Sequence, residues 1–221
     1  MVRGYFIALE GIDGAGTTTQ ARRLAGRLRR TGRTVLLTRE PSAGPVGRLI
    51  DRLITTCPTD QESTAEFHKT LALLFAADRL DHLTREILPA LSESRVVITD
   101  RYVLSSWAYQ SVRVEESWVR EINRHAPMAD LTLVLDAPVD VCMERVGRRK
   151  CRLQVFEHAA FLRRVRARYR SIARQCARRH NVVLVDAASS IDGVEAAVWS
   201  LVQSALEGRR TKGPGRQRGR S

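Results

Sequence analysis

The sequence predicts a single α/β domain in which helices cover both faces of a parallel β-sheet. Short, continuous apolar runs recur along the chain, and stretches with a helical spacing of apolar residues separate them. Parallel strands buried on both faces have such continuous apolar runs, and strand–helix alternation is typical of the class. A glycine-rich loop between the first run and the first helical stretch is the third observation, because such loops bind phosphate in this class.

Each predicted element follows from one of these patterns. The strands are expected at 5–9, 34–38, 95–99, 131–135 and 182–186. The helices are expected at 18–30, over most of 65–91, around a stripe of apolar residues from Phe161 to Cys176 spaced three and four apart, and at 191–206. No internal repeat or linker interrupts them, so residues 1–207 are predicted to form one domain.

Composition narrows the class of protein. No apolar run approaches the roughly 20 residues of a membrane helix, and the N-terminus enters a strand without the apolar stretch of a signal peptide. The four cysteines show no C-x-x-C spacing. We therefore expect reduced thiols and a cytoplasmic location.

The formal net charge of +13 is concentrated in part at the C-terminus, where residues 208–221 hold six basic side chains and no acidic one. Such a tail can bind nucleic acid or can be a disordered, solubilising end. We favour the second interpretation because no aromatic residues interleave with the charges. Nucleic-acid binding is expected to be weak at most, and through this tail.

The loop GIDGAGTT matches the phosphate-loop pattern G-x-x-x-x-G-K-[ST] at Gly11, Gly16 and Thr18. The intervening positions are Ile12, Asp13, Gly14 and Ala15. Thr17 stands where the pattern has lysine, so no side-chain charge is supplied there to a transferred phosphoryl group. Losing one preorganised donor costs about 10²–10³ in rate when nothing compensates. The spacing alone also allows a glycine-rich turn without a ligand.

Three further motifs carry polar residues at expected strand ends or on a helix. Arg39 ends the second strand and Asp100-Arg101 ends the third, at the edge where α/β sheets bind ligands. Asp100 is suited to binding Mg²⁺ or the waters around it, and Arg101 is suited to binding a substrate phosphate. Phe75 and Arg79 lie four positions apart on one face of a helix. The ring could stack on a nucleotide base, and the guanidinium could hydrogen-bond the edge of that base. Solvated surface charges, and core packing for Phe75, are the alternatives.

A basic cluster follows the fourth strand and is predicted to form a mobile lid at about 145–157. Its members are Arg145, Arg148, Arg149, Lys150 and Arg152. The alternative is one more exposed, arginine-rich surface.

Taken together, the motifs resemble bacterial thymidylate kinases. The matching segments are FIALEGIDGAG, TREP, LLFAADR, TDRYVLSSWAYQ, APMADLTLVLDAP and FEHAAFLRRVRARY, in the family's order over about residues 3–170. The resemblance implies a three-layer P-loop nucleoside-monophosphate-kinase fold with a five-stranded parallel sheet of order 2-3-1-4-5. It also implies transfer of the ATP γ-phosphate to dTMP, and a homodimer.

The resemblance further implies a role for each matching residue. Residues 11–18 would cradle the ATP phosphates, with Thr18 and Asp100 on Mg²⁺ and Asp13 on the deoxyribose 3′-hydroxyl or the metal shell. Arg39 and Arg101 would hold the dTMP phosphate. Phe75 would stack on thymine, Arg79 would bind its edge, Ser106 and Gln110 would make the remaining base contacts, and Tyr109 would lie beneath the sugar.

Two positions depart from the family pattern. One is Thr17, and the other is Val155, which stands where the family's Asp-Arg-Phe-Glu has arginine. The missing charge would then come from the lid, with Arg148 and Arg149 as the expected donors. Because of these departures, a non-catalytic nucleotide-binding protein remains an alternative. A kinase of another (deoxy)nucleoside or monophosphate is a further alternative, which TREP, FAADR and SSWAYQ disfavour.

Overall fold

The computed structural model describes residues 4–56, 64–146 and 152–211. Its centre is a five-stranded sheet of order β2-β3-β1-β4-β5, in which every neighbouring pair is parallel. The strands are β1 (Tyr5–Gly11), β2 (Val35–Arg39), β3 (Val96–Asp100), β4 (Leu131–Asp136) and β5 (Val182–Asp186). The predicted fold class and strand order are confirmed.

Strand β1 lies at the middle of the sheet, and all seven of its residues are buried. Its register sets Leu9 beside Asp100 of β3 and Gly11 beside Leu135 of β4. Arg39, the last residue of β2, pairs with Asp100 from the other side. Because the strands are parallel, the loops that follow their carboxyl ends all lie at one edge of the sheet.

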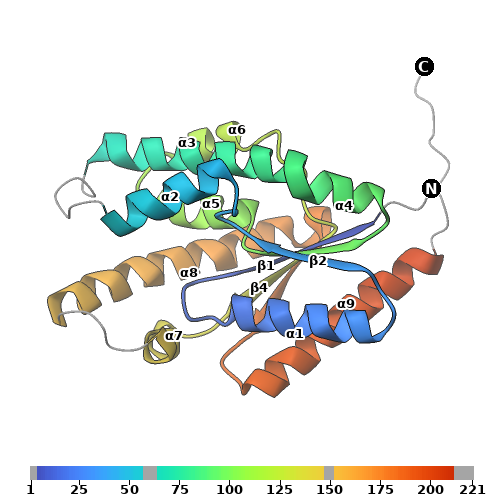
Figure 1. The fold of residues 1–221 in the computed structure, drawn as a ribbon. Helices are drawn as coiled ribbons and strands as arrows, with labels where there is room; N and C mark the ends of the chain where they lie inside the picture. The colour runs from blue at the N-terminus through green and yellow to red at the C-terminus, as the bar shows by residue number, and fades with distance from the viewer. Residues whose placement is uncertain (1–3, 57–63, 147–151, 212–221) are drawn as a thin grey trace.

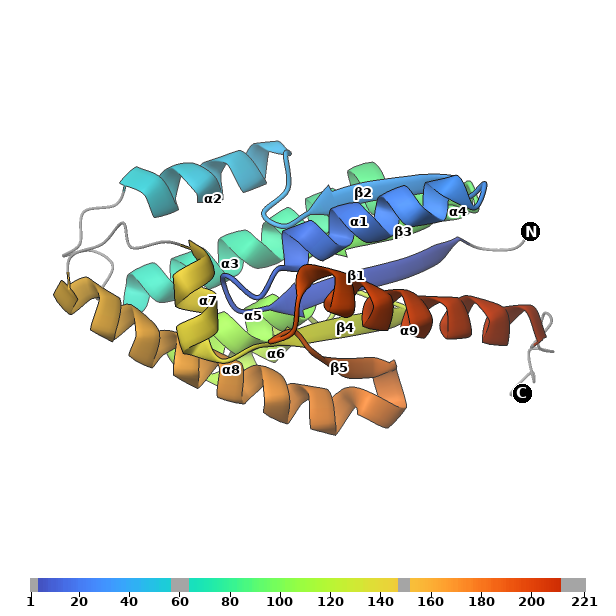
Figure 2. The ribbon, with the colours of Figure 1, turned by 90° about the horizontal axis from the view of Figure 1, so that it is seen from below.

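Helices form a layer on each face of the sheet (Figure 1, Figure 2). Helices α1 (Thr17–Arg30) and α9 (Ile191–Thr211) pack together on one face. The other face is covered by α4 (Leu88–Ser92), α5 (Val103–Tyr109) and α8 (Arg152–His180), with α3 (Ala65–His82) against α5. The remaining helices are α2 (Pro45–Thr56), which packs on α3, η2 (Leu83–Ile87), η3 (Gln110–Val112), α6 (Glu116–Ile122) and α7 (Val139–Val146).

The helices differ from the expectation in three ways. The stretch predicted as one helix over 65–91 is helical throughout but contains a π-turn, η2, between α3 and α4. Helices α2, α5, α6 and α7 were not predicted. Helix α9 continues to Thr211, so the first residues of the predicted tail are helical, and 212–221 lie outside the described residues. No helix in the described ranges is long and apolar enough to cross a membrane.

Candidate active site

The phosphate loop connects β1 to α1 and needs its glycines for two different reasons. Gly14 and Gly16 have φ values of 83° and 96°, in the left-handed region that disfavours other residues. A Cβ on Gly14 would also lie 2.3 Å from the carbonyl oxygen of Cys142, whereas one on Gly16 would meet nothing within 4 Å. The loop is thus packed against α7 on one side and open beside the first turn of α1. The free N–H groups of that turn favour an anion.

Thr17 is the first residue of α1 and its side chain is buried, with 6% of the residue exposed. Its methyl carbon Cγ2 lies 3.3 Å from where a Cβ on Gly11 would stand. Within the described part of the chain, no hydrogen bond joins the Thr17 hydroxyl to another group. The side chain therefore fills space at the root of the loop and brings no charge to it.

Thr18 and Asp100 lie in direct contact across the loop. The Thr18 hydroxyl donates a hydrogen bond to Asp100 Oδ2. Asp100 is 8% exposed, and its other oxygen, Oδ1, is buried without a partner in the described residues. A hydroxyl beside an unsatisfied carboxylate oxygen fits Mg²⁺, a hard cation that binds through few protein oxygens and takes phosphates and waters as its other ligands. No group of three or more His, Cys, Asp or Glu side chains in the described ranges offers a metal site of its own.

Arg101 is held between the phosphate loop and α5. Its backbone is left-handed, with φ of 70°, and its Nη1 donates to the Gly11 carbonyl at 3.0 Å. Its Nη2 pairs with Asp13 Oδ1 at 2.5 Å, and the guanidinium carbon lies 5.1 Å from the centre of the Tyr109 ring. The structure thus brings Asp13, Arg101 and Tyr109 together.

The Tyr109 hydroxyl connects this group of side chains to the backbone of the phosphate loop. It accepts a hydrogen bond from the Asp13 backbone N–H at 3.0 Å. Burial raises the pKa of Tyr109 well above its usual value. The hydroxyl therefore stays protonated at neutral pH, and its own proton is available for donation.

Arg39 reaches into solvent from the end of β2. Its side chain is 67% exposed and lies 3.9 Å from Asp51 of α2. An exposed pair of this kind contributes little to stability. The guanidinium is thus accessible to an anion at the same edge of the sheet as Arg101.

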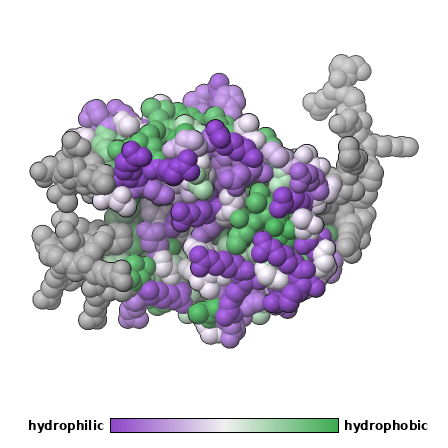
Figure 3. All heavy atoms as spheres, in the orientation of Figure 1, coloured by the Kyte–Doolittle hydropathy of each residue, from purple (hydrophilic) through white to green (hydrophobic). Residues whose placement is uncertain are grey.

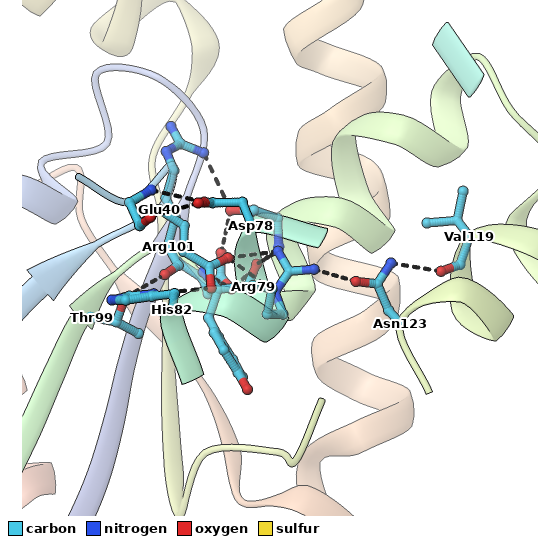
Figure 4. Close-up of polar contacts among 12 residues, drawn as sticks. Glu40, Asp78, Arg79, His82, Thr99, Arg101, Val119 and Asn123 are labelled. Carbon is cyan, nitrogen blue, oxygen red and sulfur yellow. Dashed lines mark hydrogen bonds and ion pairs between the residues drawn. The ribbon is translucent and has the colours of Figure 1, made fainter. Parts of the chain in front are cut away.

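Arg79 lies in a different environment from the one expected for a residue that binds a base edge. Its side chain is 1% exposed, and Glu40 Oε2 accepts from both Nε, at 3.0 Å, and Nη2, at 2.7 Å. Nη2 also donates to the Tyr102 carbonyl at 3.2 Å, and Nη1 donates to Asn123 Oδ1. Figure 4 shows this guanidinium between Glu40 and Asn123. Of its five N–H groups, only one on Nη1 has no acceptor among the described residues.

Asp78, the residue before Arg79, binds Ser42 in the loop that follows β2. Its two carboxylate oxygens accept from the Ser42 backbone N–H at 2.8 Å and the Ser42 hydroxyl at 2.6 Å. Glu40 forms a cis peptide bond with Pro41, and Ser42 is the next residue. Two consecutive residues of α3 therefore fix the loop that follows Arg39.

The remaining predicted base and sugar contacts lie on α3, on α5 and at the start of η3. Phe75 is half-buried on α3. Ser106 Oγ and Gln110 Oε1 are both buried and have no hydrogen-bond partner in the described residues. Buried polar atoms without partners are costly, so they point to a bound ligand or water.

Glu10, the residue before the phosphate loop, was not singled out by the sequence motifs. Its fully buried carboxylate accepts from the backbone N–H groups of Tyr102 (3.0 Å) and Ser105 (3.2 Å), and from the hydroxyls of Ser105 (2.6 Å) and Tyr169 (3.0 Å). Burial raises the pKa of Glu10, and the hydrogen bonds from Ser105 and Tyr169 oppose that rise. Glu10 thus joins β1 to the first turn of α5 and to α8.

The segment predicted to form a lid, residues 145–157, is only partly described, because 147–151 lie outside the described residues. Arg145 donates to the carbonyls of Ala187 at 3.0 Å and Ser189 at 3.4 Å, so it is tied to the loop between β5 and α9. Arg148 and Arg149, the expected charge donors, lie outside the described residues.

Several residues that build the site do not stand out in the sequence, although some of them carry a signal. Glu40 and Asp78 stand inside the TREP and LLFAADR motifs, but their neighbours Arg39 and Arg79 drew the functional interpretation. Glu10 was detectable as a lone acid at the end of an apolar strand. Asn123 had no local signal, because its partner Arg79 is 44 positions away in the chain.

The phosphate loop follows the central strand, and the Thr18–Asp100 hydroxyl–carboxylate pair lies beside it. Arginines stand at the ends of the two strands on one side of the central strand. These features define a P-loop protein with the nucleoside-monophosphate-kinase fold. The family model described as thymidylate kinase matches residues 9–198. The chain belongs to the thymidylate kinase family.

Individual relatives agree with the family match. The chain is 41% identical to the "Probable thymidylate kinase" of Pyrococcus horikoshii, over 94% of this chain and 100% of that protein. It is 40% identical to the "Thymidylate kinase" of Thermomicrobium roseum, over 94% of this chain and 99% of that protein. A "Putative thymidylate kinase" of Treponema pallidum is 35% identical, over 87% of this chain and 92% of that protein.

Proposed function

We propose that this protein is an active dTMP kinase that uses ATP and Mg²⁺ to make dTDP and ADP. The observation that carries the proposal is the shared edge of the sheet. It places the phosphate loop and the Thr18–Asp100 pair next to Arg39 and Arg101, the two arginines suited to an acceptor phosphate. The relatives carry the name of this activity over nearly the whole chain.

The acceptor phosphate would be held by Arg39 and Arg101. Arg101 is already oriented by Asp13 and by the Gly11 carbonyl, so little freedom is lost when it binds a phosphate. An oxygen of the dTMP phosphate then attacks the γ-phosphorus of ATP, the bond from that phosphorus to the β–γ bridging oxygen breaks, and ADP leaves. The protein contributes positioning and positive charge, which dominate catalysis of this reaction.

Mg²⁺ would be held by Thr18 and Asp100, with ATP phosphate oxygens and waters as further ligands. When bound, it neutralises charge on the phosphates. The buried Asp100 Oδ1 that lacks a partner supports this assignment.

The thymidine part would lie against Phe75, with Ser106 and Gln110 on the base and Tyr109 beneath the sugar. The two unpartnered buried oxygens of Ser106 and Gln110 support base contacts at these positions. The one spare N–H of Arg79 allows a single hydrogen bond to the base edge. Asp13, a half-exposed residue of the loop, would contact the sugar or the metal shell.

The charge missing at Thr17 is proposed to come from the lid, through Arg148 and Arg149. Two other basic side chains near the loop are already engaged, which supports this choice. Arg145 binds carbonyls of the β5–α9 loop, and Arg166 makes a two-point ion pair with Asp136 at 2.6 and 3.0 Å.

The test is ADP formation by the purified protein with ATP, Mg²⁺ and a panel of acceptors: dTMP, dUMP, dCMP and thymidine. We expect dTMP to give the highest kcat/KM, and chelation of Mg²⁺ to stop turnover. Preference for another acceptor would replace the assignment of dTMP. Binding of dTMP and ATP without turnover of any acceptor would favour the non-catalytic interpretation that Thr17 and Val155 motivate.

The proposal includes a homodimer, supported by an apolar stripe along α3, η2 and α4. The stripe consists of Leu73, Ala77, Leu80, Thr84 and Leu88, all exposed in the single chain. Green surface lies over α3 along the top of the view in Figure 3. In an antiparallel pair of these helices, Leu73 would face Leu88 of the second copy and Ala77 would face Thr84, so the stripe is self-complementary.

Sedimentation velocity tests the dimer. The wild type is expected to sediment as a dimer at micromolar concentration, and Leu80→Glu, which places a charge at the centre of the stripe, as a monomer. Arg124→Glu, a charge change on an exposed residue off the stripe, is the control. A monomeric wild type would refute this part of the proposal.

Two expectations from the sequence complete the proposal. Both nucleotides are metabolites of the cytoplasm, so we propose a cytoplasmic location. Weak nucleic-acid binding through the basic tail would be revealed by comparing DNA retention of the full chain with a truncation after Glu207, which removes all six basic residues of the tail. Equal retention would exclude a role of the tail.

A further inference from the structure

The buried guanidinium of Arg79 connects segments that carry both acceptor-phosphate arginines. On one side it binds Glu40, the residue after Arg39. On another it binds the carbonyl of Tyr102, the residue after Arg101. A shift of this guanidinium would therefore move the backbone next to Arg39 and Arg101 together.

Asn123 restrains the third side of the same guanidinium. It is buried at the end of α6, where its Oδ1 accepts from Arg79 Nη1 and its Nδ2 donates to the Val119 carbonyl at 2.8 Å. The Val119 bond fixes which end of the amide faces Arg79. Figure 4 shows the chain of contacts from Val119 through Asn123 and Arg79 to Glu40.

We propose that Asn123 is a positioning residue of the acceptor site, a role that rests on the proposed dTMP kinase function. By fixing Nη1, it orients the guanidinium so that Nε and Nη2 meet Glu40 and the Tyr102 carbonyl. These bonds in turn place Arg39 and Arg101 for the acceptor phosphate. Asn123 does not touch the substrate, so it acts only through Arg79.

Two features around Arg79 explain why its guanidinium needs Asn123 to hold its orientation. The Tyr102 carbonyl restrains only Nη2 of Arg79. Glu40 binds Arg79 through the single oxygen Oε2, so this ion pair does not by itself stop the guanidinium from pivoting about that point. Its other oxygen, Oε1, lies 3.5 Å from Nδ1 of the buried His82. Asn123 is the contact opposite Glu40, and so it opposes the pivot.

Kinetics of Asn123→Ala test the proposal, with Val119→Ala as the matched control. Val119 is fully buried on the same helix, and its truncation loosens α6 without removing the acceptor of Arg79. Asn123→Ala is expected to raise KM for dTMP about tenfold (about 1.4 kcal/mol) and to change KM for ATP less than about twofold. Val119→Ala should leave both KM values near those of the wild type, even if it lowers the melting temperature as much.

Rescue and phosphate dependence provide the second measurement. Asn123→Asp retains an oxygen acceptor for Arg79 and should restore most of the dTMP affinity. In calorimetric binding, Asn123→Ala should weaken dTMP more than thymidine, because thymidine lacks the phosphate and is left only with the base contact proposed for Arg79.

Equal weakening of dTMP and thymidine would show that Asn123 acts on the base site and would overturn the proposal. So would a dTMP KM unchanged in Asn123→Ala. A wild type that turns over no acceptor refutes the proposed function instead, and the binding measurements then still test the positioning role.

Discussion

Replacing Glu40 with alanine would leave the Arg79 charge buried with only two neutral acceptors, Asn123 Oδ1 and the Tyr102 carbonyl. The pair is among the most buried in the protein, with the side chains of Arg79 and Glu40 1% and 2% exposed. Removing one partner of a buried ion pair costs about 3–5 kcal/mol, because the other charge remains desolvated. That loss is a large part of the roughly 5–15 kcal/mol that stabilises a typical domain.

The assay is urea and thermal unfolding of the wild type and Glu40→Ala. At about 2–4 °C per kcal/mol for a chain of this size, the melting temperature should fall by roughly 6–20 °C. Glu121→Ala is the control, because Glu121 forms an exposed pair with Arg124, their side chains being 59% and 60% exposed. Its loss should cost less than about 0.5 kcal/mol.

A double variant separates loss of the pair from loss of packing. Glu40→Ala with Arg79→Met removes both charges, so its cost should be smaller than the sum of the two single costs by at least about 1 kcal/mol. A Glu40→Ala cost below about 1 kcal/mol, or strictly additive singles, would refute the view that this pair is desolvated.

Three other predictions follow from the phosphate loop and its surroundings. Gly14→Ala should destabilise the protein in urea unfolding by about 1–3 kcal/mol more than Gly16→Ala does. The reason is that a Cβ at position 14 would meet the Cys142 carbonyl, whereas one at position 16 would meet nothing within 4 Å. Equal losses of unfolding free energy in the two variants would contradict this. Burial raises the pKa of Glu10, so the folded state binds the extra proton and wild-type stability falls as the pH rises from 4.5 through the folded pKa. Glu10→Gln should lack this slope, and parallel pH profiles would contradict the prediction. Thr18→Ala should raise the Mg²⁺ concentration for half-maximal activity about tenfold without changing dTMP affinity in calorimetry, and an unchanged Mg²⁺ requirement would remove Thr18 from the metal site.

The strands were predictable because a parallel strand buried on both faces is apolar throughout. Tyr5 to Leu9 show this without reference to any partner. The edge strand β5 is also apolar from Val182 to Val185, although Leu184 is exposed. Strand order was not contained in those patterns and came from the family resemblance. The short helices α5, α6 and α7 were missed because seven or eight residues give too few apolar repeats to distinguish a helix from a loop.

The candidate site was predictable where function follows from local spacing. The phosphate loop, Asp100 and Arg101 each stand at the end of an apolar run, which places them at one edge of the sheet. The environment of Arg79 was not predictable in this way. Its burial depends on Glu40 and Asn123, 39 and 44 positions away, and no periodicity relates them.

The most direct test of the central claim is transfer of the labelled γ-phosphate of ATP to dTMP by the purified wild type, compared with Thr17→Lys. A phosphate loop without lysine is proposed to be sufficient when the lid supplies charge. We therefore predict labelled dTDP from the wild type, dependent on Mg²⁺, and loss of that product when Arg148 and Arg149 are both replaced by alanine. Absence of labelled dTDP from the wild type, with product appearing in Thr17→Lys, would contradict the account and identify the protein as a nucleotide-binding relative with a disabled donor site.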